Sequence, residues 1–171
     1  FALSGKRTLL IDCDLRRPSL QTQLDARETP NGLSDALRAS KLDFNPDEFS
    51  HPDPMTPLRI VFAGRADAGP TDVIAGSDAL AGLIRATRFK FDAVILDAPP
   101  VGPVVDALYL ARHVDVTLFV VKWAETRQQD VRTAVRNLAQ VMPDEAHILP
   151  VLGQQRFSGA DRRRYASYYP S

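Results

Sequence analysis

The 171-residue sequence predicts one three-layer α/β domain built on a doubly wound, mostly parallel sheet. Short runs rich in β-branched residues alternate along the chain with longer stretches of helical periodicity. The strand runs are apolar without interruption, which is typical of parallel strands that helices cover on both faces. With 44% hydrophobic and 25% charged residues, the chain is long enough to bury a continuous core.

Five strands are expected, each a short apolar run bounded by polar or turn-forming residues. They lie near Arg7 to Cys13, Leu58 to Ala63, Asp92 to Asp97, Val116 to Val121 and His147 to Leu152.

Four helices are expected between these strands, because apolar residues recur there every three or four positions. They span Ser34 to Ser40, Asp72 to Arg88, Val104 to His113 and Thr126 to Met142. The stretch Lys41 to Pro57 is rich in Pro, Asp and Ser, and we expect it to form a surface loop rather than a domain boundary.

The tripeptide Ser4-Gly5-Lys6 has the letters of a phosphate-binding loop in the wrong context. In such a loop, Gly-Lys-Ser/Thr opens a helix whose backbone N–H groups face the anion. Here Arg7 begins a strand, so we interpret Gly5 as the residue that ends a helix whose last turn is Phe1 to Leu3. The full pattern Gly-x-x-x-x-Gly-Lys-Ser/Thr is absent from the sequence, and we expect the fold to be incomplete at its N-terminus.

Composition limits the classes of partner. Lys+Arg and Asp+Glu each number 21, so no overall field attracts nucleic acid. No apolar run reaches the about 18 residues that span a bilayer, and no signal peptide opens the sequence. The single cysteine, Cys13, lies in an apolar strand and is expected to be buried. The histidines His51, His113 and His147 lack metal-ligand spacing and are interpreted as structural.

Carboxylates end two of the predicted strands. Asp12 and Asp97 each follow an apolar run, and carboxyl ends of parallel strands form the ligand-binding edge of an open sheet. Asp14 would point the same way as Asp12 on a continuing strand. Such oxygens suit Mg²⁺, and one carboxylate could accept a proton from an attacking hydroxyl. Taken singly, each Asp is equally well explained as a strand-ending residue; Arg16 and Arg17 either reach phosphate or the acids, or are simply solvated.

In motif order and spacing, most of the chain resembles the bacterial tyrosine kinases of capsule and exopolysaccharide export. The resemblance rests on Leu9-Leu10-Ile11-Asp12-x-Asp14-Leu15-Arg16-Arg17-Pro18, Gly32-Leu33-Ser34-Asp35, Ala63-Gly64, Pro70-Thr71-Asp72 with Ser77, Phe91-Asp92-x-Val94-Ile95-Leu96-Asp97-x-Pro99-Pro100, and Asp106-Ala107. The Asp-x-Pro-Pro strand is shared with many partition-type ATPases, whereas the Asp-x-Asp-Leu-Arg-Arg-Pro strand is more specific.

The resemblance implies a P-loop NTPase-like domain over residues 1–157, with ATP and Mg²⁺ as cofactors. Asp12 and Asp14 match the variant Walker A′ motif, and Asp97 matches the Walker B aspartate. Asp12 would help to activate the tyrosine hydroxyl, and Asp14 and Asp97 would position Mg²⁺ partly through water. We therefore predict Asp12, Asp14 and Arg16 as catalytic residues, and Asp12, Asp14 and Asp97 as metal and nucleotide ligands.

The segment 158–171 has no strand or helix periodicity and is predicted to be a flexible tail. It carries Tyr165, Tyr168 and Tyr169, three of the four tyrosines in the chain. The resemblance implies that these tyrosines are phosphoacceptors, phosphorylated in trans between subunits of a ring. Each phosphate adds a charge of about −1.5 to −2, which releases a tail from an acidic site or docks it on arginines.

The leading hypothesis is an autophosphorylating protein-tyrosine kinase domain that regulates polymerisation and export of exopolysaccharide or capsule. The resemblance places such a domain at the cytoplasmic face of the bacterial inner membrane, with membrane-anchored polysaccharide export machinery as partner. This segment alone is expected to be inactive, because the phosphate loop does most of the positioning in phosphoryl transfer. Two alternatives stay open: a partition- or positioning-type ATPase, and a non-catalytic scaffold of the same fold.

Overall fold

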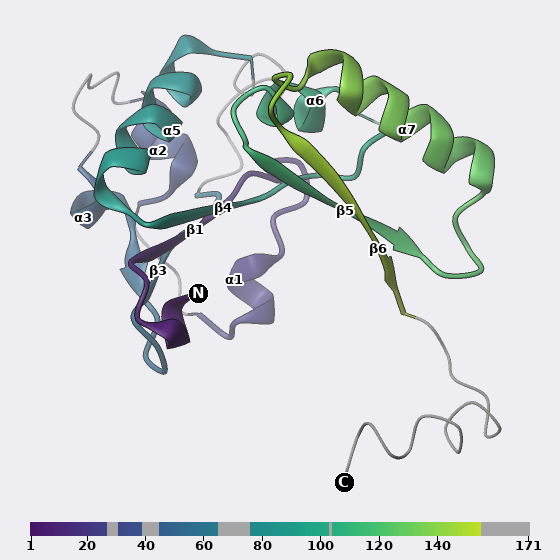
Figure 1. Cartoon of the computed structure of the whole chain (residues 1–171). Coiled ribbons are helices and arrows are strands. Elements are labelled where there is room, and N and C mark those ends of the chain that lie inside the picture. Colours follow the sequence, from purple (N-terminus) through teal and green to yellow (C-terminus); the bar gives the residue numbers. More distant parts are fainter. Residues whose placement is uncertain (27–30, 39–44, 65–75, 103, 155–171) are drawn as a thin grey trace, which may run out of the picture.

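The computed structural model is a mostly parallel α/β fold (Figure 1). It describes residues 1–26, 31–38, 45–64, 76–102 and 104–154. The predicted tail, with its three tyrosines, and the Pro70-Thr71-Asp72 segment lie outside the described residues.

All five predicted strands are present, with ends trimmed or extended by one or two residues. Four strands form one sheet in the order β2-β3-β1-β4, in which β1 pairs in parallel with β3 and β4, and β2 pairs antiparallel with β3. A second sheet consists of the parallel pair β5 and β6. The bounds are β1 Thr8–Asp12, β2 His51–Pro52, β3 Leu58–Val61, β4 Ala93–Asp97, β5 Val116–Lys122 and β6 His147–Gly153.

The division into two sheets differs from the single sheet that the sequence predicts. In the described part of the chain, β4 pairs with a strand only on its β1 side, and β5 pairs only with β6. Figure 1 shows the two sheets side by side, with α7 running along the β5 and β6 pair. Apolar periodicity identifies strands but carries no information on which strands are neighbours, so this division was not accessible from sequence.

The predicted helices are present with shifted bounds, parts of the predicted Ser34–Ser40 and Asp72–Arg88 helices lie outside the described residues, and α1 and α3 are additional. The helical segments are η1 Ala2–Ser4, α1 Leu20–Gln23, α2 Leu33–Arg38, α3 Pro46–Phe49, α5 Asp78–Lys90, α6 Asp106–Ala111 and α7 Gln128–Val141. The predicted surface loop Lys41 to Pro57 is wrong in part, because it contains α3 and β2. Phe49 and Ser50 are buried there, and pairing with β3 supplies hydrogen bonds that a polar composition alone does not reveal.

Local capping agrees with the sequence interpretation at Gly5. Gly5 has a left-handed backbone (φ 81°) and its N–H donates to the carbonyl of Ala2, so it ends η1 as expected. Ser77, which the sequence analysis placed inside the helix Asp72 to Arg88, instead caps α5, where its Oγ accepts the N–H of Leu80 at 3.2 Å. The chain therefore enters β1 directly from a helical turn and not from a phosphate loop.

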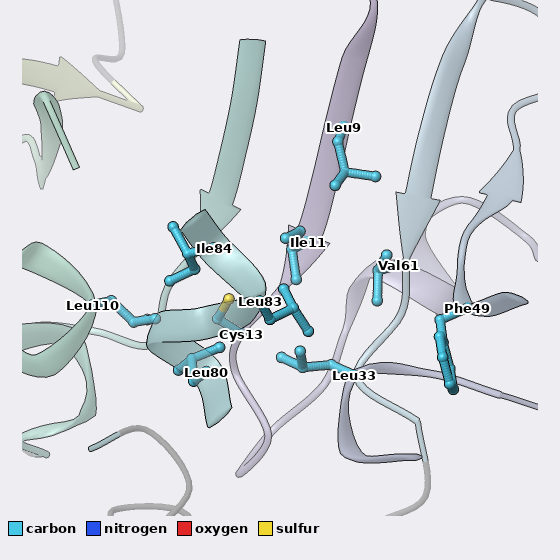
Figure 2. Packing of buried hydrophobic residues seen from close by; sticks show 10 residues of the cluster. All are labelled: Leu9, Ile11, Cys13, Leu33, Phe49, Val61, Leu80, Leu83, Ile84 and Leu110. Carbon is cyan, nitrogen blue, oxygen red and sulfur yellow. The ribbon is translucent and has the colours of Figure 1, made fainter. Parts of the chain in front are cut away.

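Among the described residues, two hydrophobic clusters form the core. The larger packs Leu9 and Ile11 of β1 against Leu83 of α5 and Leu33 of α2 (Figure 2), and Cys13 is buried in it as predicted. The smaller cluster, under α7, consists of the buried residues Ala111, Leu138 and Met142. Helix α6 contributes Leu110 to the larger cluster and Ala111 to the smaller one, so it connects the two halves of the fold.

Candidate active site

Two acids meet at the carboxyl edge of the four-stranded sheet, as the sequence predicts. Asp12 is the last residue of β1 and Asp97 the last of β4, and the two are partners in the parallel register. The N–H of Cys13 donates to the carbonyl of Asp97 at 2.8 Å, which keeps the two strands paired to their ends. Because both strands run in the same direction, both carboxylates leave the sheet at the same edge.

Asp14 reaches this edge by a different route from the predicted one. Strand β1 ends at Asp12, so the alternation of a continuing strand does not apply to Asp14. The chain turns instead: the N–H of Asp14 donates to Asp12 Oδ1 at 3.2 Å, and Asp14 Oδ1 accepts the N–H of Arg17 at 3.0 Å. We refer to residues 12–17 as the acid turn. Short aspartate side chains favour such local bonds to backbone N–H groups over extension of a strand.

The carboxyl of Asp12 is buried and only partly satisfied. Asp12 is 1% exposed, and its Oδ2 has no hydrogen-bond partner among the described residues. Burial raises the pKa of Asp12 from 3.8 to about 6, against the opposing effects of the backbone N–H groups of Asp14 and Leu20, and the charges of Asp97 and Asp14 raise it further. A buried acceptor oxygen without a partner is unusual in folded proteins and calls for an explanation such as an ion or a catalytic role.

The three acids share one electrostatic environment. Burial raises the pKa of Asp97, and the charge of Asp14 raises it further. Repulsion among like charges is relieved by a cation or by protonation, so this edge attracts both.

The donor set fits a hydrated Mg²⁺ ion. Among the described residues, no group of three His, Cys, Asp or Glu side chains forms a ready-made metal cage. Mg²⁺ does not require one, because it keeps several waters and is held by one or two carboxylates together with substrate phosphates. The unpartnered Oδ2 of Asp12 and the neighbouring Asp97 supply oxygens of that kind.

Arg16, predicted as catalytic, binds a residue that we did not assign to the site. Its Nε donates to Asp106 Oδ2 at 2.9 Å and a terminal guanidinium nitrogen donates to Asp106 Oδ1 at 3.2 Å. Sequence reasoning placed Asp106 only among the segments of the family resemblance. An aspartate in the first turn of a helix is ordinary, and no local signal marks it as the partner of a residue 90 positions away.

Other predicted residues lie away from this edge or outside the described chain. His51 Nε2 lies 3.2 Å from the carbonyl of Asn31, in keeping with a structural role. Tyr165, Tyr168 and Tyr169 are not among the described residues. Within the described ranges, no helix combines the length and apolarity needed to cross a bilayer.

The sequence relatives of the chain include a polysaccharide biosynthesis transport protein and tyrosine-protein kinases. No family model matches the sequence. The chain is 34% identical to the succinoglycan biosynthesis transport protein ExoP of Rhizobium meliloti, over 99% of the chain and 22% of that protein. It is 30% identical to the tyrosine-protein kinase Wzc of Salmonella typhi, over 79% of the chain and 18% of that protein. The chain thus spans about a fifth of the length of these two relatives.

The structural comparison agrees with the sequence comparison. The kinase domain of VpsO superposes with a TM-score of 0.78 at 27% identity, covering 91% of this chain and 75% of that domain. The fold is therefore the doubly wound α/β fold of the P-loop NTPases, as predicted. Fold, motif order and sequence identity agree: the chain belongs to the bacterial tyrosine-kinase family of capsule and exopolysaccharide biosynthesis proteins.

Proposed function

We propose that the edge formed by Asp12, Asp14 and Asp97 binds Mg²⁺ and ATP, and that the protein containing this domain transfers the γ-phosphate to tyrosine. The observation that carries the proposal is the buried, unpartnered Oδ2 of Asp12, which lies next to Asp97 at the carboxyl edge of a parallel sheet. The names of the relatives, which are tyrosine-protein kinases and a succinoglycan biosynthesis transport protein, support the same activity.

Each acid has a distinct role in this proposal. Asp12, with its pKa near 6, is poised to accept the proton of a tyrosine hydroxyl close to neutral pH. Asp14 and Asp97 hold the metal, partly through water. When bound, Mg²⁺ offsets the charge on the transferring phosphate oxygens. The turn bonds of Asp14 fix its carboxylate beside Asp12, so that the site is organised before nucleotide arrives.

In our proposal, the phosphate loop follows a further parallel strand that lies between β4 and β5. Both strands have an edge without a partner in the described chain. Apolar side chains near these edges are exposed: Ile95 is 40% exposed, Leu118 64% and Val120 65%. One further parallel strand would pair with the edges of both β4 and β5 and would partly cover these side chains. Residues 1–171 alone, with no loop of the required pattern, should neither hold ATP tightly nor transfer phosphate.

The acceptors in this proposal are Tyr165, Tyr168 and Tyr169, which enter the site of a neighbouring copy in a ring-like homo-oligomer. Trans phosphorylation adds negative charge to the tail and so changes its affinity for the acid edge. This assembly would operate at the cytoplasmic face of the inner membrane, with membrane-anchored polysaccharide export machinery, and regulate polymerisation and export.

The test uses the natural full-length protein incubated with Mg²⁺ and ATP labelled at the γ-phosphate. We expect label on Tyr165, Tyr168 or Tyr169, located by mass spectrometry, and its loss in Asp12→Ala. Asp92→Ala is the matched control: it removes a carboxylate next to the opposite end of β4, where Arg7 binds it, and should keep the label. Phosphate release without tyrosine label would instead establish an ATPase, and absence of both would leave only a scaffold.

A further inference from the structure

A bidentate ion pair joins the acid turn to helix α6. Arg16 donates from two guanidinium nitrogens to the two carboxylate oxygens of Asp106, at 2.9 and 3.2 Å. The two side chains differ sharply in exposure, since that of Arg16 is 41% exposed and that of Asp106 only 3%. Planar, two-point pairing fixes orientation as well as distance, which a lysine in place of Arg16 could not do.

The position of Asp106 explains how this ion pair can hold the acid turn in place. Asp106 lies in the first turn of α6, nine residues after Asp97, and α6 is anchored by Leu110 in the larger cluster and Ala111 in the smaller. Asp106 is therefore held on a packed element. Arg16, by contrast, lies in a turn that follows the end of β1, where no strand ladder holds the backbone.

The bonds of the acid turn form a continuous chain that ends at this ion pair. Asp12 accepts the N–H of Asp14, Asp14 accepts the N–H of Arg17, and Arg16 is held by Asp106. The first half of the turn is also held by packing, since Cys13 is buried in the larger cluster and Leu15 packs against it. The ion pair acts on the second half, where the N–H of Arg17 orients the carboxylate of Asp14, so its loss would loosen that carboxylate relative to Asp97.

We propose that Asp106 is a positioning residue: through Arg16 it fixes the acid turn, and so sets the distance between the carboxylates that bind Mg²⁺. The inference rests on the proposed metal-binding function for its consequence, but the geometric part stands on the hydrogen bonds alone. It also assigns Arg16 a role in holding the turn, in place of direct contact with the reacting atoms.

A purely structural role is the competing explanation, because a buried carboxylate that loses its partner destabilises any fold. The Arg7–Asp92 pair is a control for the loss of a bidentate ion pair, at a more exposed carboxylate than that of Asp106. It is also bidentate, with contacts of 2.7 and 3.2 Å, and it joins residues that precede β1 and β4, at the end of the sheet away from the acids. Loss of the Arg7–Asp92 pair removes an ion pair at the opposite end of β1 and β4 and leaves the contacts of the acid turn in place.

The experiment compares wild type with Asp106→Asn, Arg16→Lys and Asp92→Asn, using two readouts. The first is amide hydrogen exchange, by NMR, at Asp14 and Arg17, whose N–H groups are bonded within the turn. The second is the Mg²⁺ concentration that half-saturates tyrosine labelling by the full-length protein. We expect Asp106→Asn and Arg16→Lys to speed exchange at both amides and to raise half-saturation by about tenfold or more, as loss of a ligand-orienting partner does.

Asp92→Asn should change neither readout. A lower melting temperature in Asp106→Asn with unchanged exchange in the turn and unchanged Mg²⁺ dependence would overturn the proposal and leave a structural role. If Asp106→Asn does not fold, Arg16→Lys decides, because it keeps a positive partner for the buried carboxylate. If wild type shows no labelling at any Mg²⁺ concentration, the proposed function fails, while the exchange rates still decide whether Asp106 orders the turn.

Discussion

Replacing Asp12 with Asn should remove a pH-dependent free-energy cost that the folded chain carries at neutral pH. Burial raises the pKa of this carboxyl from 3.8 to about 6, so the folded state binds the proton more tightly than the unfolded state does. The sign follows directly: as the pH rises from below 3.8 through 6, the wild-type chain loses stability relative to a variant that cannot ionise there. The cost is complete above the folded pKa and absent below the unfolded one.

The size of the effect follows from the same two pKa values. The difference between 3.8 and about 6 corresponds to about 3 kcal/mol of unfolding free energy, an upper bound for a group whose neighbours are also acidic. The substitution also places an NH₂ donor where Asp12 has the unpartnered acceptor Oδ2, which changes stability at every pH. That change does not depend on the titration of Asp12, so it shifts the curve without changing its slope.

Urea unfolding of both chains from about pH 3.5 to about pH 7.5 measures this difference. We expect Asp12→Asn to gain up to about 3 kcal/mol relative to wild type as the pH rises across that range. Asp92→Asn should show the opposite slope when the titration is extended to about pH 2, because the hydrogen bond from Arg7 lowers the pKa of Asp92 to about 2, and that stabilisation is lost as the pH falls from 3.8 through this value. Parallel pH curves for wild type and Asp12→Asn would refute the assignment of a buried carboxyl with a raised pKa.

Three further predictions concern packing and reactivity. Leu138 is 1% exposed, so Leu138→Ala should lower the free energy of unfolding in urea by about 2 to 5 kcal/mol. Leu118 is 64% exposed, so Leu118→Ala should change it by less than about 0.5 kcal/mol. Gly32→Ala places a Cβ 2.5 Å from neighbouring backbone atoms and should lower the melting temperature, whereas Gly82→Ala, with nothing within 4 Å, should raise it. The Cys13 thiol, whose pKa burial raises far above its ordinary value, should resist iodoacetamide in the native chain and react once urea unfolds it; rapid native labelling would contradict its burial.

The part of the site that sequence could predict is the part that the strands themselves determine. Asp12 and Asp97 each end an apolar run, and in a parallel sheet that alone places them at one edge. The register pairs Asp12 directly with Asp97, whereas the prediction required only that the two residues lie at the same edge of the sheet. The role of Gly5 as the end of a helix could also be predicted from its neighbours in sequence, because a glycine between a helical turn and a strand is typical of a left-handed cap.

What sequence could not predict depends on contacts between distant residues. The pairing of Arg16 with Asp106 spans 90 positions and has no local signature. Asp14 was predicted on a strand because the alternation rule was extended past Asp12, where short-range bonds from aspartate side chains to backbone N–H groups take over. The separation of β5 and β6 from the other sheet follows from strand neighbours, and apolar runs do not encode neighbours.

The most direct test of the central claim is where a divalent cation binds. Titrating Mn²⁺ into the ¹⁵N-labelled chain broadens the amide signals nearest the ion, so it locates even a weakly held metal without requiring activity. We predict that the amide signals of Cys13, Asp14 and Ala98 broaden first, and that those of Arg7 and Asp92, at the opposite end of β1 and β4, stay sharp. First broadening at other surface acids such as Asp144 and Glu145, with the Asp12 and Asp97 edge unaffected, would contradict it.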